Sequence, residues 1–97
     1  PDFSDADNFL TPFFVNGGFF NNHYSNPEVE KLINEQRVTT DPAARTKLIE
    51  EVQGLIAQDV PTLPLLQGTQ VAVTTDAIDG VVLDGSFKFR LGTITKK

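Results

Sequence analysis

Proline residues mark the starts of two consecutive helix patterns in the middle of the chain and the end of the second pattern. This feature constrains the fold most. The first pattern begins at Asn26-Pro27 and the second at Asp41-Pro42. Asparagine and aspartate side chains cap helix N-termini, and proline is favoured in the first turn because the N–H that it lacks would have no partner there. Pro61 ends the second pattern, since its ring disfavours the α conformation in the preceding residue. We therefore predict two helices followed by an extended segment.

Each predicted helix carries one apolar face. In the first helix the apolar residues lie within one turn of each other: Val29, Leu32 and Ile33. In the second helix they are separated by four, three and one residues: Leu48, Val52, Leu55 and Ile56. These spacings place each set on one side of a helix. We expect the second set to be buried against the first helix and against a short strand at residues 63–66.

Residues 1–26 carry three aspartates, no lysine or arginine, and six of the eight phenylalanines. We interpret this stretch as an acidic loop in which two short apolar pieces, 13–15 and 19–20, flank a glycine turn at 16–18. Two roles remain open for the aromatic side chains. They either pack in the core beneath the helices or line a cleft that binds a ligand.

Metal binding and catalysis are not favoured by the residue types present. A calcium loop that began at Asp5 would need an oxygen ligand at its fifth position and a glycine at its sixth, where the chain has Phe9 and Leu10. The chain has one histidine, His23, and no cysteine, so the usual zinc ligands cannot gather. No nucleophile, oxyanion hole or cofactor motif accompanies the N-terminal aspartates. We therefore predict no cofactor, no metal site and no catalytic residue.

The C-terminal third of the chain has the alternation that is typical of short strands. Residues 71–75 alternate in the way that a single strand would. Asp84-Gly85 is a two-residue hairpin signal, because both central positions of a type I′ turn need positive φ. Three alternate apolar residues then share one face: Phe87, Phe89 and Leu91. We predict a β-hairpin over residues 81–91 with one buried side.

The composition limits the classes of partner. A chain of 97 residues, 39% of them hydrophobic, makes one domain at most. Its net charge of −5 argues against a nucleic-acid partner, which requires clustered cations. No apolar run approaches the roughly 20 residues that a membrane-spanning helix needs. The chain contains no methionine and begins within a predicted loop, so we expect it to be a fragment of a longer protein.

Four segments in register carry a resemblance to a known family. Residues 26–33, 41–45 and 56–65 resemble the C-terminal part of extracytoplasmic solute-binding proteins of the peptide/nickel ABC importer family. Residues 2–10 are similar to that family's Asp-Tyr-x-Asp-Pro-x-Asn-Phe segment, with phenylalanine in place of tyrosine and alanine in place of proline. The resemblance covers essentially the whole chain.

The resemblance implies a fragment of a two-lobe α/β fold of the periplasmic-binding-protein (class II) type, with two helices followed by short strands and a β-hairpin. Residues 1–66 would belong to the lobe distant from the termini. Residues 67–97 would cross the hinge and form C-terminal strands of the other lobe. The implied partners are a solute or peptide, a membrane permease and the rest of the same chain. The implied location is extracytoplasmic, in the periplasm or on the cell surface as a lipoprotein.

The resemblance also implies which residues meet the ligand. In peptide-binding members the first aspartate of the segment pairs with the α-amino group of the peptide, and the matching residue is Asp2. A carboxylate in a closing cleft offers an ammonium a charge-assisted hydrogen bond. With its neighbours, this gives three predicted ligand-binding residues: Asp2, Phe3 and Asp5. Two alternatives are a free-standing helix-pair interaction module without a transport role, and a hydrolase that uses Asp2 and Asp5.

Overall fold

The computed structural model describes residues 3–86 and 88–97 of the chain. The chain divides into two units. We call Asp5–Pro64 the helical unit, and we call Leu65–Lys97, to which Phe3 and Ser4 also belong, the C-terminal unit. No helix in the described part of the chain is long and apolar enough to cross a membrane.

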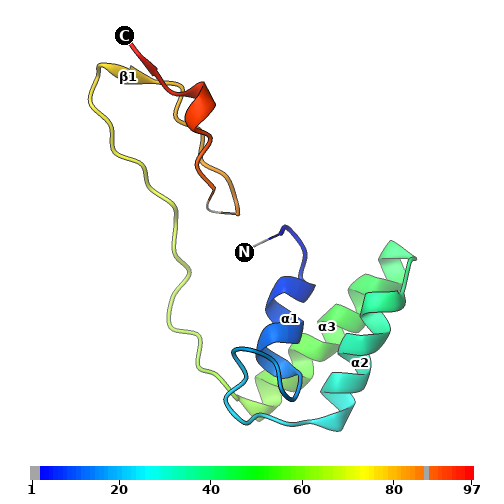
Figure 1. The fold of residues 1–97 in the computed structure, drawn as a ribbon. Helices are drawn as coiled ribbons and strands as arrows, with labels where there is room; N and C mark the ends of the chain where they lie inside the picture. The colour runs from blue at the N-terminus through cyan, green and yellow to red at the C-terminus, as the bar shows by residue number, and fades with distance from the viewer. Residues whose placement is uncertain (1–2, 87) are drawn as a thin grey trace. The chain divides into compact units, whose positions relative to one another are not determined.

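Three helices build the helical unit: α1 (Asp7–Phe14), α2 (Pro27–Val38) and α3 (Pro42–Asp59). The structure confirms the two helices predicted from the proline pattern, which are α2 and α3. They lie side by side and are joined by a short connection, and α1 packs against α2 (Figure 1). The core of the unit lies between the three helices: Leu10, Val29, Leu32, Ile33 and Val52 are buried.

The predicted helix starts are confirmed atom by atom. The Asn26 side-chain oxygen accepts a hydrogen bond of 3.0 Å from the N–H of Glu28 and one of 3.4 Å from that of Val29. The Asp41 carboxylate accepts one of 2.7 Å from the N–H of Ala44. These bonds satisfy N–H groups that have no partner inside the helix. Local sequence therefore determines where α2 and α3 begin.

The end of α3 carries a conformational cost. The helix ends at Asp59, and Val60 adopts the left-handed conformation with φ 47° and ψ 53°. A β-branched residue rarely adopts this conformation, which normally favours glycine. The helix stops where Pro61 predicts, and the chain leaves it as an extended segment.

The predicted packing of α3 is confirmed in part. Val52 is buried, while Leu48, Leu55 and Ile56 are half-buried against the core. The predicted strand at 63–66 is wrong. This segment forms no strand in the described part of the chain, and its three leucines are exposed. A strand needs a neighbouring strand for its hydrogen bonds, and among the described residues no strand pairs with this segment.

The interpretation of the N-terminal stretch as a loop is also wrong, because residues 7–14 form α1. Pro12 lies inside this helix and argues against it in the sequence. Leu10 decides the outcome, since it is buried against α2 and α3. The predicted glycine turn is present, with Gly17 at φ 78°.

The C-terminal unit contains little regular structure. Two short strands, β1 (Ile78–Asp79) and β2 (Thr95–Lys96), pair in antiparallel register with Ile78 opposite Lys96. A short 3₁₀ helix, Leu91–Thr93, precedes β2. Gly80 has φ 76°, and a Cβ at this position would lie 1.9 Å from the Thr93 carbonyl oxygen. Only glycine therefore fits at this close approach.

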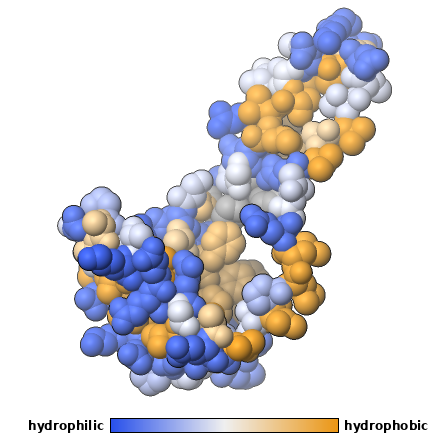
Figure 2. Space-filling view, turned by 180° about the vertical axis from the view of Figure 1, so that it is seen from behind, coloured by the Kyte–Doolittle hydropathy of each residue, from blue (hydrophilic) through white to orange (hydrophobic). Residues whose placement is uncertain are grey.

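The hairpin predicted over 81–91 is wrong in its position. The antiparallel pair lies outside this range, and the described residues within the range form no strand. Phe89 and Leu91 are exposed instead of buried, and Phe87 lies outside the described residues. Hydrophobic residues gather on the visible face of this unit (Figure 2). Alternation alone did not identify the strands, because the alternating side chains Phe89 and Leu91 are exposed and are not buried against another layer in the described structure.

Candidate functional site

The structure describes two of the three predicted ligand-binding residues. Asp2 lies outside the described residues. The Phe3 side chain is half exposed, at 50%. Asp5 lies at the start of the helical unit, two residues before α1, and forms an ion pair with Arg45 of α3. Asp5 is therefore already engaged within the chain.

Asp5 and Arg45 form a two-pronged ion pair. The Arg45 Nη1 donates to Asp5 Oδ2 at 2.8 Å, and its Nη2 donates to Asp5 Oδ1 at 2.6 Å. Asp5 Oδ1 also accepts a hydrogen bond of 2.8 Å from the N–H of Asp7. Paired contacts of this kind fix direction as well as distance, because the planar guanidinium matches the carboxylate. The pair ties residues that are 40 positions apart.

Gln36 connects this ion pair to α1 and α2. Its side chain is fully buried. The amide oxygen accepts hydrogen bonds of 3.0 Å and 2.9 Å from Arg45 Nε and Nη2, and the amide nitrogen donates one of 2.7 Å to Asp7 Oδ1. The opposite orientation of the amide would place donor against donor and oxygen against carboxylate. We call Asp5, Asp7, Gln36 and Arg45 the polar junction, and it joins all three helices.

The polar junction holds Asp5 in its charged form. The hydrogen bond from Arg45, followed by that from the Asp7 N–H, lowers the pKa of Asp5 from 3.8 to about 2. The hydrogen bond to Asp5 likewise raises the pKa of Arg45. Both groups remain ionised at neutral pH, and the pair has the character of a fixed structural link.

A second polar contact joins the end of α3 to the residues before the start of α2. Asp59 Oδ2 accepts hydrogen bonds of 2.6 Å from the Tyr24 hydroxyl and 2.8 Å from the Asn26 amide. Burial, followed by the hydrogen bond to Asp59, raises the pKa of Tyr24 to about 12. The same hydrogen bonds lower the pKa of Asp59. This contact ties the end of α3 to the residues that lead into α2.

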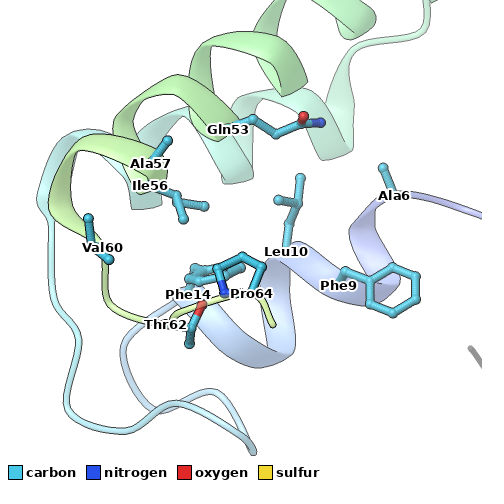
Figure 3. A pocket seen from close by; sticks show the side chains of 10 residues that line it. All are labelled: Ala6, Phe9, Leu10, Phe14, Gln53, Ile56, Ala57, Val60, Thr62 and Pro64. Carbon is cyan, nitrogen blue, oxygen red and sulfur yellow. The ribbon is translucent and has the colours of Figure 1, made fainter. Parts of the chain in front are cut away.

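An apolar groove of about 530 Å³ lies in the helical unit between α1, the end of α3 and the segment that follows α3. Leu10 from α1 and Ile56 from α3 point into the same space, with Phe14 and Pro64 on its other side (Figure 3). Its lining is mostly apolar: Ala6, Phe9, Leu10, Phe14, Gln53, Ile56, Ala57, Val60, Thr62 and Pro64. A groove of this composition suits apolar side chains of another segment or ligand.

The core-packing role predicted for the aromatic residues is confirmed for Phe14, and the ligand-binding role stays a prediction. Phe14 packs against the core and meets the Tyr24 ring edge-on, with ring centres 6.2 Å apart. Phe13 and Phe20 stack with ring centres 5.0 Å apart, and Phe19 is largely exposed. The aromatic stretch therefore supplies both core and surface.

Several acidic side chains of the described residues are occupied by partners within the chain. Among residues 3–86 and 88–97, no group of three or more histidine, aspartate or glutamate side chains is placed to hold a metal ion. The carboxylates of Asp5, Asp59 and Asp84 are all engaged in hydrogen bonds within the chain. The arrangement offers an apolar groove and a charged segment before α1.

Three residues of the polar junction were not predicted as site residues, and the sequence contained signals for two of them, Gln36 and Arg45. Gln36 continues the buried series of Val29, Leu32 and Ile33 at helical spacing, so a polar residue on an apolar face indicates a buried hydrogen-bonding group. Arg45 is a cation near the start of α3, where the positive end of the helix dipole disfavours it. An unfavourable position of this kind points to a partner outside the helix.

Comparison with known proteins gives matches over most of the chain. It is 33% identical over 86 residues to the oligopeptide-binding protein OppA of Bacillus subtilis. This match covers 88% of this chain and 16% of OppA. It is 35% identical over 83 residues to the probable di/tripeptide-binding protein 5 of Pseudomonas aeruginosa. This match covers 81% of this chain and 16% of the relative. It is 30% identical over 92 residues to the glutathione-binding protein GsiB of Escherichia coli. This match covers 88% of this chain and 18% of GsiB.

No family model and no solved structure matches the chain. The chain thus spans 16% to 18% of the length of these relatives.

Proposed function

Since the chain belongs to the peptide-binding solute-binding proteins, as a segment that spans 16% to 18% of their length, we propose that it is part of the substrate-binding component of an ABC importer. The complete protein captures a peptide outside the membrane and delivers it to the permease. The observation that carries this proposal is the match to oligopeptide-binding and di/tripeptide-binding relatives across more than 80% of the chain.

The proposal includes a location and a mode of action. The protein acts outside the cytoplasmic membrane, in the periplasm or on the cell surface as a lipoprotein. It binds and releases its solute without chemical turnover. The engagement of the Asp5 and Asp59 carboxylates within the chain supports a binding role over a catalytic one.

We propose further that the remainder of the chain completes both units. Residues 1–66 belong to the lobe distant from the termini, and residues 67–97 cross the hinge into the other lobe. The apolar groove of the helical unit supports the first part of this proposal, because a groove lined mostly by apolar side chains suits apolar side chains of another segment. In the complete protein other segments of the same chain cover the groove.

Asp2 and Phe3 contact the peptide in this proposal. The Asp2 carboxylate pairs with the peptide ammonium in the closed cleft, where low water content strengthens the pair. The half-exposed ring of Phe3 supplies apolar contact beside it. Asp5 is the third predicted ligand-binding residue, and its carboxylate is bonded to Arg45.

Calorimetry on the full-length protein tests this function. We expect short peptides with a free amino terminus to bind, and N-acetylated copies to bind weakly. Asp2→Asn should cost about 2–4 kcal/mol for the free peptide and little further for the acetylated one. Asp76→Asn, at an exposed position of the C-terminal unit, serves as the control. Absence of binding to any peptide, or binding of sugars or metal chelates instead, would contradict the proposal.

A further inference from the structure

Two short segments of the C-terminal unit, residues 71–74 and 81–83, lie outside the strand pair of β1 and β2. Figure 1 draws the first of them within an extended trace that carries no arrow. Among the residues that the structure describes, the N–H and C=O groups of both segments form no hydrogen bond with another backbone group. Each segment therefore presents backbone donors and acceptors that a neighbouring strand can use.

The residue types of the first segment are those of a strand. Val71, Val73 and Thr74 are β-branched, and such residues are enriched in strands. The side chains of Val71 and Val73 are 79% and 91% exposed. Proteins that leave a strand edge in water usually protect it with a charge, a proline or a bulge, and residues 69–75 contain no charged residue and no proline. We expect an edge of this composition to be covered in the complete protein.

Both segments line one groove of about 490 Å³ within the C-terminal unit, and Phe89 and Ile94 add apolar side chains to its lining. The side-chain nitrogen of Gln70 donates a hydrogen bond of 2.8 Å to the Asp84 carbonyl oxygen. A side chain thus bridges the ends of the two segments, which do not pair with each other through their backbones. The groove places apolar side chains beside backbone groups that are able to bond a strand.

We propose that residues 71–74 pair with a strand from the part of the full-length protein that lies outside residues 1–97. The incoming strand bonds the backbone of this segment and places alternate apolar side chains in the groove, against residues 81–83. In this mode of recognition the backbone bonds give affinity, and the alternate side chains give specificity. The inference rests on the proposed function, because it takes the chain as part of a longer binding protein.

The length of the relatives favours the same protein as the source of the strand. The chain spans 16% to 18% of their length, so most of the proposed full-length protein lies outside it. A strand on the same polypeptide meets the groove at a high effective concentration, because its association is intramolecular. A second copy of the chain and a bound peptide are the two other sources of an extended strand, and the experiment distinguishes them.

Hydrogen exchange measured by mass spectrometry compares the full-length protein, without ligand, with the 97-residue chain. We expect the amides of residues 71–74 to exchange about a hundredfold or more slowly in the full-length protein. In the 97-residue chain they should exchange at the rate of an unstructured chain at every protein concentration. Equally fast exchange of these amides in both proteins would overturn the proposal.

Proline substitution in the full-length protein tests whether the backbone makes the contact. Successive N–H groups of a strand point to opposite sides, so either Ala72→Pro or Val73→Pro removes a donor that faces the incoming strand. We expect at least one of these variants to lose most of the protection of residues 71–74. Val73→Ala is the matched control, because it shortens a side chain and keeps the N–H, and it should retain the protection.

Two results of this comparison would contradict strand pairing. Full protection in both proline variants would show that no backbone donor of Ala72 or Val73 is used. A loss in Val73→Ala equal to that in Val73→Pro would show that the valine side chain, and not the backbone, carries the contact.

The other sources of a strand give different exchange patterns. Protection of residues 71–74 that rises with the concentration of the 97-residue chain would assign the strand to a second copy. Protection in the full-length protein that appears only on addition of trialanine would assign it to the bound peptide. Either result overturns the proposal.

Failure of the proposed function is distinguishable from failure of strand pairing. A full-length protein that protects residues 71–74 and binds no peptide in calorimetry would support the pairing and reject the proposed function. A full-length protein that binds peptide while these amides exchange as fast as in the 97-residue chain would reject the pairing alone.

Discussion

The helical unit and the C-terminal unit differ in where their backbone finds its hydrogen bonds. In the helical unit the bonds run within α1, α2 and α3, and side chains cap the starts of α2 and α3. In the described part of the C-terminal unit, strand pairing is confined to β1 and β2. A helix completes its bonds within one segment, whereas a strand needs a neighbour. We infer that the helical unit carries its own structural information, whereas residues 65–97 specify little of the structure of the C-terminal unit.

Charge substitution in each unit gives the largest expected difference. Val52→Asp places an unpaired charge in the core, because Val52 is fully buried. We expect it to lower the free energy of unfolding by about 3–5 kcal/mol. Val73→Asp, at a side chain that is 91% exposed, should change it by less than about 0.5 kcal/mol. Urea unfolding followed by circular dichroism at the helix band measures both, and similar midpoints would show that α3 does not bury this face.

Removal of the buried amide tests the polar junction. Gln36→Leu keeps most of the volume and leaves Arg45 and Asp7 without their partner. We expect a loss of about 1–3 kcal/mol in the free energy of unfolding. Gln58→Leu, at an exposed position of α3, is the control and should have little effect. A Gln36→Leu variant as stable as the parent would mean that the junction contributes nothing to the helical unit.

The sequence predicted the parts of the fold that short segments decide. Asn26, Asp41 and Pro61 act on residues within four positions, so the start of α2 and both ends of α3 followed from them. Helix α1 did not follow, because burial of Leu10 overrides the unfavourable Pro12. Tertiary packing of this kind has no signal inside the segment itself.

The same reasoning separates the predictable from the unpredictable part of the candidate site. Asp5 and Arg45 lie 40 positions apart, and no local pattern joins them. The strand pair of the C-terminal unit likewise lies beside a contact between residues 13 positions apart, the close approach of Gly80 to Thr93. Asp2 and Phe3 were predicted from the family resemblance, and their contact with a ligand stays a prediction.

Gly80 tests whether the small strand pair is specified by that approach. Gly80→Ala would bring a Cβ against the Thr93 carbonyl and force a side chain into positive φ. The conformational term alone costs about 1–2 kcal/mol. We expect the NMR contacts between Ile78 and Lys96 to vanish in this variant and to persist in Gly92→Ala, where a Cβ meets nothing within 4 Å. Persistence in both variants would mean that the pairing does not depend on Gly80.

Acid titration gives the smallest expected effect. Asp5 has a lowered folded-state pKa of about 2. Its contribution to stability is therefore full above about pH 4 and is lost as the pH falls toward 2, since protonation removes the charge that Arg45 holds. We expect the stability of Asp5→Asn to fall less over this range than that of the parent.

Asp84→Asn separates the two units in the same titration. Hydrogen bonds from Ser86 lower the pKa of Asp84, which lies in the C-terminal unit. The helix signal of this variant should respond to acid as the parent does. If the acid response of the helix signal changed in Asp84→Asn and not in Asp5→Asn, then Asp84, and not Asp5, would control the acid stability of the helical unit.

Hydrogen exchange on the 97-residue chain tests most directly whether the helical unit is specified on its own and the C-terminal unit is not. We predict that amide protons of α2 and α3 exchange about a hundredfold or more slowly than those of residues 65–74, which lie outside the strand pair. In the full-length protein residues 65–74 should gain protection from their new neighbours. Equal protection of both regions in the isolated chain, or fast exchange throughout α2 and α3, would contradict the account.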